Sequence, residues 1–243
     1  MNPCSLDRGG KMAGSRKLNL VSCLADLALF KGMGTAELAR IAAFSSTKHL
    51  ARGEDLFQAG QACEGLYFVV DGLIKLYAKA ANGQEKVLEV VSPGGCVCEA
   101  LAFSESGHGV HAGALMDALV LFVPKPVLVQ ELERNTGLAM RLLKGLSRRM
   151  NGLLKDIEAV TLHSGVQRVV DYLLHAPSVP EEPTQQQNLT VSLPASKGTI
   201  ASLLSVTPEH FSRILHELQS RGLISVERRQ IHILDAQGLA QYV

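Results

Sequence analysis

Turn signals interrupt the chain between residues 50 and 123 at intervals of about eight to ten residues. The clearest part reads GLYFVVDGLIKLYAKAANGQEKVLEVVSPGG, in which apolar and β-branched stretches alternate with Asp-Gly, Asn-Gly and Pro-Gly-Gly. Asn82-Gly83 is the strongest hairpin signal, because both positions of such a turn favour positive φ. Evenly spaced strands of this kind predict an antiparallel barrel or jelly roll. The predicted strands cover residues 67–70, 73–78, 87–91 and 114–123.

The pattern changes after residue 134. Asn135-Thr136 can cap a helix that continues without proline to about residue 162. Its apolar seam repeats about every 3.5 residues, which is typical of a coiled-coil contact between two copies. A long helix packed on its own barrel would give the same seam, so both interpretations stay open. The dimer interpretation predicts a contact through Leu142, Leu146, Arg149, Leu153 and Ile157.

The C-terminal part, ASKGTIASLLSVTPEHFSRILHELQSRGLISVERRQIHIL, reads as helix, tight turn, helix and hairpin. Thr207 is a good N-cap for the second helix, and Pro208 suits its first position. One stripe of that helix is apolar, whereas Glu209 and Arg213 lie on the opposite face. Two helices joined in this way, followed by a hairpin, are typical of a winged helix-turn-helix.

The outward face of the second helix has the chemistry of major-groove recognition. An arginine donates two hydrogen bonds to guanine, and a glutamate accepts from the cytosine amino group. Arginines at the tip of the hairpin suit phosphate contacts. The alternative is that Glu209 and Arg213 only pair with each other in solvent. The predicted DNA-binding residues are Thr207, Glu209, His210, Ser212, Arg213, Arg228 and Arg229.

Charge does not by itself identify a partner. The whole chain has a formal charge of +1. From residue 163 onward, the sequence contains six Lys and Arg and seven Asp and Glu. Double-stranded DNA as partner therefore requires a local basic patch and binding as a homodimer.

Two stretches resemble the Crp/Fnr family of bacterial transcription regulators. GEDLFQAGQACEGLYFVVDGLIKLY is similar to the family's cyclic-nucleotide-type β-roll, and TPEHFSRILHEL is similar to its recognition helix. Glu209, Ser212 and Arg213 resemble the Fnr and Dnr branches, which read TTGAT-type half-sites. NGQEKVLEV, ERNTGLAMRLL and QRVVDYLL are most similar to the Dnr type, whose regulators respond to nitrogen oxides through haem.

The resemblance implies an α+β fold and a sequence-specific regulator, an activator that works with RNA polymerase. The expected parts are a disordered lead-in at 1–20, a β-roll sensor domain (a jelly roll) at 21–134, a dimerisation helix at 135–162 and a winged helix-turn-helix at 163–243. The rival hypothesis is a cyclic-nucleotide-binding signalling module that acts through protein contacts instead of DNA.

The segment GGCVCEALAFSESGHGVHA stands where the family's receptors bind the cyclic nucleotide. There, the resemblance implies, a glutamate binds the ribose and an arginine ten residues later neutralises the phosphate. Glu99 occupies the first place, but Gly109 and Val110 stand at the second. No Lys or Arg lies between Lys86 and Lys125. Because nothing local offsets a phosphate charge, cyclic AMP is not expected as a ligand.

Other effectors stay open. Cys4 and Cys23 are too few and too far apart for the family's iron–sulfur cluster. Haem, a thiol switch and another small ligand remain candidates, although cysteines are often simply buried. The histidines expected for haem in the Dnr type do not line up, since Leu29 and Gln167 stand near those places. The candidate effector residues are Cys96, Cys98, Glu99, His108 and His111.

Composition restricts the remaining classes. Five scattered cysteines favour a reducing interior over a disulfide framework. No run approaches the roughly 18 to 20 apolar residues of a membrane span, and the N-terminus lacks the apolar core of a secretory signal. We therefore expect a cytoplasmic protein. The sequence has no HExxH, Walker or GxGxxG signature, so an enzyme is not expected.

Overall fold

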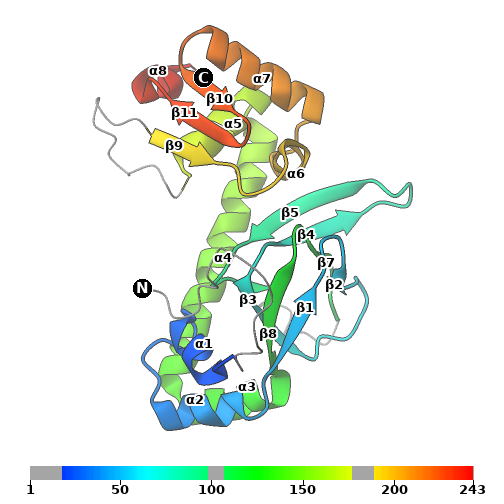
Figure 1. The fold of residues 1–243 in the computed structure, drawn as a ribbon, viewed down its shortest axis with the longest axis vertical. Helices are drawn as coiled ribbons and strands as arrows, with labels where there is room; N and C mark the ends of the chain where they lie inside the picture. Colours follow the sequence, from blue (N-terminus) through cyan, green and yellow to red (C-terminus); the bar gives the residue numbers. More distant parts are fainter. Residues whose placement is uncertain (1–17, 98–106, 177–188, 243) are drawn as a thin grey trace, which may run out of the picture. The chain divides into compact units, whose positions relative to one another are not determined.

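A computed structural model describes residues 18–97, 107–176 and 189–242 (Figure 1). These residues form two compact units. The first unit holds the chain up to Ala81 together with Glu89–Met150, and the second holds Asn82–Leu88 together with Asn151–Val243. The two units meet between Met150 and Asn151, inside one long helix, so their boundary does not coincide with the end of an element. The boundaries expected at residues 134 and 162 therefore remain predictions.

The strands of the β-roll are β1 (Ser46–Leu50), β2 (Asp55–Phe57), β3 (Gly65–Asp71), β4 (Ile74–Lys79), β5 (Glu85–Val91), β6 (Cys96–Val97), β7 (His111–Ala114) and β8 (Ala118–Pro124). They form two four-stranded sheets with the orders β1-β8-β3-β6 and β2-β7-β4-β5. The paired strands run antiparallel. The prediction of an antiparallel jelly roll is thus confirmed.

An apolar core fills the space between the two sheets. Ile74 and Leu76 of β4 are buried, whereas Lys75 between them is half-buried, as the alternation of side chains along a strand requires. Val69 and Val120 are completely buried in the same core. Each such side chain contributes about 1.5–3 kcal/mol through its burial. This core, drawn from strands far apart in the sequence, holds the two sheets together.

Two details of the roll differ from the sequence-based expectation. The β4–β5 connection spans residues 80–84, and only Gly83 has positive φ, while Gln84 N–H donates to the Asn82 side chain at 3.0 Å. The expected single strand at 114–123 is divided into β7 and β8. The chain bends there against Gly72, whose φ is +82° and whose missing Cβ would lie 2.5 Å from the Asp117 carbonyl oxygen. A side chain at Gly72 would collide with that bend.

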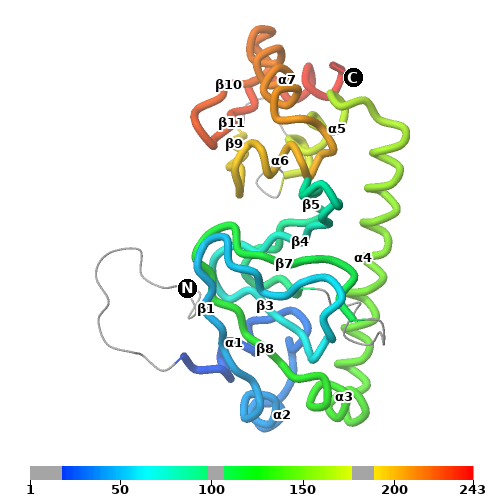
Figure 2. Tube along the Cα trace, turned by 90° about the vertical axis from the view of Figure 1, so that its right-hand side faces the viewer, coloured from blue at the N-terminus to red at the C-terminus, as the bar shows by residue number. Residues whose placement is uncertain are grey.

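Three helices that the sequence did not predict complete the first unit: α1 (Leu20–Asp26), α2 (Thr35–Ala42) and α3 (Lys125–Arg134). They share an apolar cluster with one face of the β1-β8-β3-β6 sheet (Figure 2). The Asn19 side chain caps α1 by accepting from Val21 N–H at 3.1 Å. Leu18 and Leu20 pack against this cluster. Leu18 and Leu20, which the sequence assigned to a disordered lead-in, thus pack against the core, and the lead-in itself stays a prediction.

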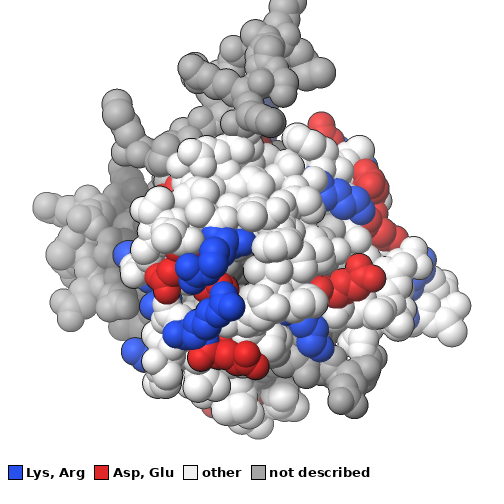
Figure 3. Space-filling view, turned by 90° about the horizontal axis from the view of Figure 1, so that it is seen from below, with Lys and Arg blue, Asp and Glu red and all other residues white. Residues whose placement is uncertain are grey.

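An ion pair joins α2 to α3. The Arg40 guanidinium donates from Nε and Nη2 to the two carboxylate oxygens of Glu131, each at 2.8 Å. Glu131 is only 2% exposed, and these hydrogen bonds hold the pKa of its carboxyl below the ordinary value. The face that carries α2 and α3 shows Lys and Arg interspersed with Asp and Glu (Figure 3). Within the described residues, that face carries no broad field of one sign.

The predicted long helix is present as α4 (Thr136–Leu162). Near its start, Leu138 and Leu142 are buried within the protein's own chain. Arg141 Nε donates to the Leu29 carbonyl at 2.7 Å and ties this part of the helix to the segment between α1 and α2. No helix of the described residues combines the length and the apolar character needed to cross a membrane.

The second unit contains α5 (Gly165–Leu174), β9 (Leu189–Ser192), α6 (Lys197–Leu203), α7 (Pro208–Ser220), β10 (Ile224–Glu227), β11 (Gln230–Ile233) and α8 (Ala236–Gln241). The three strands form one antiparallel sheet in the order β10-β11-β9. Helix, turn, helix and hairpin therefore follow each other as the sequence predicted. Phe211 and Leu218, both completely buried, anchor α7 in the core of this unit.

Candidate DNA-binding surface and effector region

The turn between α6 and α7 is fixed by caps at both helix starts. Ser196 Oγ accepts from Thr199 N–H at 3.1 Å, and Thr207 Oγ1 accepts from His210 N–H at 3.2 Å. Between the helices, Ser205 has φ of 57°, in the left-handed region that residues with a Cβ rarely adopt. The Thr207 hydroxyl oxygen caps its own helix. A contact between Thr207 and DNA therefore stays a prediction.

Arg168 of α5 holds this turn, a function that sequence reasoning missed. Its guanidinium donates from Nε to the Leu204 carbonyl at 2.8 Å and from Nη2 to the Ser205 carbonyl at 3.1 Å. It also donates from Nη1 to the His163 carbonyl at 2.7 Å. One cation thus satisfies carbonyls at the end of α6 that the helix itself cannot pair. The only sequence signal is a basic residue within a largely apolar helix, and such residues are too common for this one to be singled out.

The two faces of α7 differ sharply. One stripe, made of Phe211, Ile214, Leu215 and Leu218, is buried, whereas Glu209, Ser212 and Arg213 are exposed. No ion pair joins Glu209 to Arg213, and both side chains belong to the described residues. The structure therefore does not contain the alternative arrangement, in which Glu209 and Arg213 pair with each other. An unpaired arginine and glutamate on one outward face are available to external hydrogen-bonding groups.

His210 lies differently from the other predicted residues of α7. It is half-buried, and its ring carbon Cε1 lies 3.0 Å from the position that a Cβ on Gly165 would occupy. The ring therefore packs against the start of α5, where a larger residue at position 165 would push it aside. Its predicted contact with DNA stays a prediction, but the ring already has a neighbour within its own unit.

The predicted wing is the β10–β11 hairpin, with a two-residue connection formed by Arg228 and Arg229. Both arginines are exposed. Arg228 has φ of 56°, a conformation that glycine adopts without strain. Strained residues are often retained where their side chain has a function. An arginine at this position is consistent with a phosphate contact at the tip of the wing.

The exposed seam of α4 is shifted from the predicted one. Leu142 is only 8% exposed within its own chain, and Arg149 forms an ion pair with Glu89. Both side chains are engaged within their own chain, and their place in a dimer contact stays a prediction. Leu153 and Ile157 are exposed as expected, at 52% and 61%. With the half-buried Leu146 they continue a seam at spacings of three and four residues: Leu143, Leu146, Met150, Leu153, Ile157 and Val160.

The candidate effector residues are spread over the roll. Cys96 lies on β6 opposite Phe68 of β3 and is half-buried at the edge of the apolar cluster. His111, on β7, stacks on Tyr77 with ring centroids 5.1 Å apart. Cys98 and Glu99 lie outside the described residues. Within the described ranges, no three His, Cys, Asp or Glu side chains are grouped to hold a metal ion.

His108 is the most unusual of these residues. It is 3% exposed, and its ring stacks on Phe57 with centroids 3.6 Å apart. Its Nδ1 atom is buried without a hydrogen-bond partner. Because burial disfavours the charged form, the pKa of His108 is lowered from its ordinary value. The imidazole is thus held neutral inside the roll.

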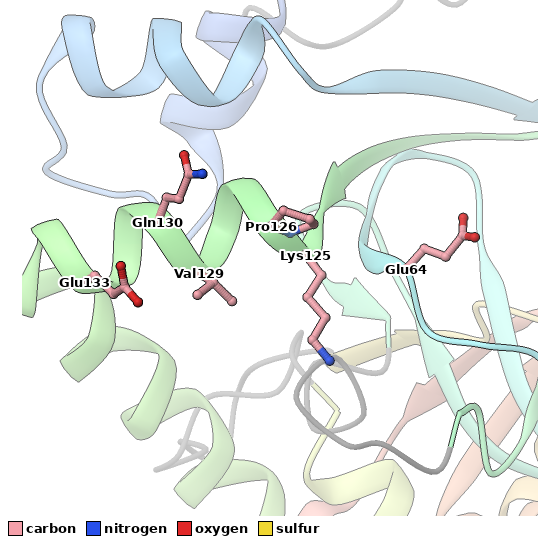
Figure 4. Close-up of a pocket in the computed structure, with 6 residues that line it drawn as sticks. All are labelled: Glu64, Lys125, Pro126, Val129, Gln130 and Glu133. Carbon is pink, nitrogen blue, oxygen red and sulfur yellow. The ribbon is translucent and has the colours of Figure 1, made fainter.

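Three described places do not supply an axial haem ligand: His108 Nδ1, the lining of the cavity beside α3, and the positions of Leu29 and Gln167. The Nδ1 atom of His108 has no accessible surface through which an iron atom could approach. A cavity of about 660 Å³ lies beside α3, but no His, Cys or Met is among its lining residues, which are Glu64, Lys125, Pro126, Val129, Gln130 and Glu133 (Figure 4). Leu29 offers only a carbonyl, already bonded to Arg141, and the Gln167 side chain caps α5. None of these positions supplies an axial ligand.

Comparisons with known proteins agree with both halves of this geometry. Residues 47–135 match the cyclic nucleotide-binding domain, and residues 167–242 match the Crp-like helix-turn-helix domain. Together these matches cover the jelly roll, α3 and the unit that carries α7.

Three relatives cover most of the chain. The probable transcriptional regulator flp of Lacticaseibacillus casei is 28% identical over 91% of this chain and 98% of its own. The structure of FixK2 from Bradyrhizobium japonicum covers 81% of this chain and 96% of its own, with 21% identity and a TM-score of 0.70. DNR from Pseudomonas aeruginosa is 31% identical over 91% of this chain and 96% of its own, with a TM-score of 0.47. With its jelly roll, long helix and helix-turn-helix in this order, the chain belongs to the Crp/Fnr family of transcription regulators.

Proposed function

We propose that this regulator binds TTGAT-like half-sites as a homodimer, and that a signal other than a cyclic nucleotide controls it through the β-roll. The observation that carries this proposal is the outward face of α7. Glu209, Ser212 and Arg213 are exposed there and lie in the first half of the helix, where recognition helices contact base edges.

The unpaired state of these groups supports base reading. Arg213 can donate to O6 and N7 of a guanine, and Glu209 can accept from a cytosine amino group. A Glu209–Arg213 ion pair would have to be broken before either residue met a base. Because the folded protein contains no such pair, binding does not carry that cost.

The exposed seam of α4 supports the homodimer. Met150, Leu153 and Ile157 together would leave a continuous apolar strip in water, and such strips usually mark a contact. Their spacing of three and four residues matches the seam of a two-stranded coiled coil. A dimer places two copies of α7 at half-sites about one helical turn apart.

The nature of the signal follows from what the roll lacks. The sequence has no Lys or Arg between Lys86 and Lys125, so a cyclic phosphate would find no local counter-charge. Neither His108 Nδ1 nor the cavity beside α3 supplies an axial haem ligand. We therefore place a redox change or an uncharged small molecule ahead of both as the input. As in other members of the family, the output would be activation through RNA polymerase.

The proposal is tested by fluorescence anisotropy with a palindromic TTGAT-type duplex and a shuffled duplex. Ile157→Asp should dissociate the dimer and lower affinity for the palindrome by at least about tenfold, because two half-site contacts are no longer linked. Arg148→Ala is the matched control, since residue 148 lies about 180° from residue 157 around the helix. Sedimentation of the same samples reports the oligomeric state. Equal affinity of the wild type for both duplexes would contradict the proposal.

A further inference from the structure

The outward face of α7 carries a histidine, His216, that the predicted DNA-binding set does not include. His216 is exposed. At 100° per residue it lies about 140° from Phe211, in a direction between Ser212 and Glu209. It follows Arg213 by three residues, or about 4.5 Å along the helix axis. The imidazole therefore continues the base-reading face toward the C-terminal half of the helix.

Nothing in the described part of the protein pairs with this imidazole. Helices α5 and α6 and strand β10 pack most extensively against α7. On α7 itself, Glu217 next to His216 is occupied, because it accepts from the Tyr242 hydroxyl at 2.6 Å and pairs with Arg221 at 3.5 Å. The other charged groups on these four elements are Arg168, Asp171, Lys197, Glu209, Arg213 and Glu227.

Three of those charged groups already have partners. Arg168 donates to carbonyls of the turn, and Asp171 pairs with His163 at 3.1 Å. Glu227 lies 3.8 Å from His232 on the wing. Arg213, one turn before His216, has the same sign as an imidazolium. Glu209 lies seven residues before His216, about 10.5 Å away along the helix axis, which is beyond the reach of an ion pair. A proton on His216 thus finds no carboxylate partner in the described protein and leaves a positive charge facing outward.

We propose that the protonated imidazole of His216 contacts a DNA phosphate, so that DNA affinity rises as pH falls. The inference rests on the proposed function of α7. Recognition helices contact base edges with their N-terminal residues, and side chains further along the same face reach the phosphates that flank the groove. Imidazole carries a charge and donates from both nitrogens only when protonated. Histidine is the side chain that ordinarily changes charge between pH 5 and 8.

The test uses the full chain and the palindromic TTGAT-type duplex, with affinity measured at about pH 6 and about pH 8 at constant ionic strength. The gain in affinity from pH 8 to pH 6 should be about two- to fivefold larger per protomer in the wild type than in His216→Gln, the size of one exposed charge contact. His216→Lys should bind tightly at both pH values, because its charge is fixed. His49→Gln, which removes an exposed histidine on β1, should keep the wild-type ratio.

The salt dependence gives a second readout. At the lower pH, His216→Gln should reduce the slope of log affinity against log salt by about one per protomer, and at the higher pH it should leave the slope unchanged. If the wild type and His216→Gln have the same pH ratio while both bind the duplex, the inference is overturned and the proposed function stands. If the wild type does not bind the duplex at either pH, the proposed function itself fails, and the inference fails with it.

Discussion

The recognition helix α7 and the first unit with its β-roll use polar side chains in opposite ways. On α7 Glu209 and Arg213 point outward and remain unpaired, and an apolar stripe on the opposite face packs the helix into its unit. In the first unit, Glu131 and His108 are the buried polar side chains among the described residues, and each is enclosed by neighbours. Polar substitutions should therefore cost DNA affinity in the second unit and folding stability in the first.

The largest test of this contrast is Glu131→Ala. We expect it to lower the free energy of unfolding of the first unit by about 2–3 kcal/mol, because Arg40 loses its buried partner. Urea denaturation of the full chain would measure this loss. Glu133→Ala is the matched control, since Glu133 lies two residues later on the same helix and is exposed. If Glu131→Ala lowered the free energy of unfolding by no more than Glu133→Ala does, the two units would not differ in this way.

His108 provides a pH-dependent test in the first unit. Its folded-state pKa is lowered by burial, so the unfolded chain takes up a proton at a higher pH than the folded protein does. Stability contributed in this way is complete above the ordinary histidine pKa of about 6.5 and is lost as pH falls from there toward the folded-state pKa. His108→Phe should weaken this fall in unfolding free energy, whereas His49→Gln should not. Parallel pH profiles for the wild type and His108→Phe would contradict the assignment.

Much of this organisation is predictable because it is local. The cap at Thr207, the stripe at Phe211 and Leu218, and the spacing of the turns in the roll all follow from residues close in sequence. The Crp-like recognition helix was found in the sequence for that reason. The outward position of Glu209 and Arg213 needed only the helical period.

The remaining features depend on contacts between distant segments. Arg40 and Glu131 are 91 residues apart, and Arg168 meets the turn at Ser205 across 37 residues. Nothing near either arginine in the sequence indicates its partner. For α4, the sequence period predicts an apolar seam along the helix, but it does not predict which side of the helix faces the rest of its own chain. Burial of Leu142 in its own chain decided which side of the helix remains exposed.

The smallest expected effect is in the turn before α7. Ser205→Gly should stabilise the second unit by about 0.5–1 kcal/mol, because glycine adopts positive φ without the strain that a Cβ imposes. Ser212→Gly, inside α7, should destabilise it by a similar amount. Thermal unfolding monitored by circular dichroism would give both signs. A loss of stability in Ser205→Gly would show that the hydroxyl matters more than the backbone conformation.

The most direct measurement of the central claim compares the wild type and Arg213→Ala on duplexes that differ at one base pair of the TTGAT-type half-site. Arg213→Ala should leave unfolding stability within about 0.5 kcal/mol of the wild type, since the side chain is exposed. It should lower the affinity by about 1–3 kcal/mol per half-site and abolish discrimination at one base pair. If Arg213→Ala binds as tightly as the wild type and keeps its preference at every position, α7 does not read the sequence through this face.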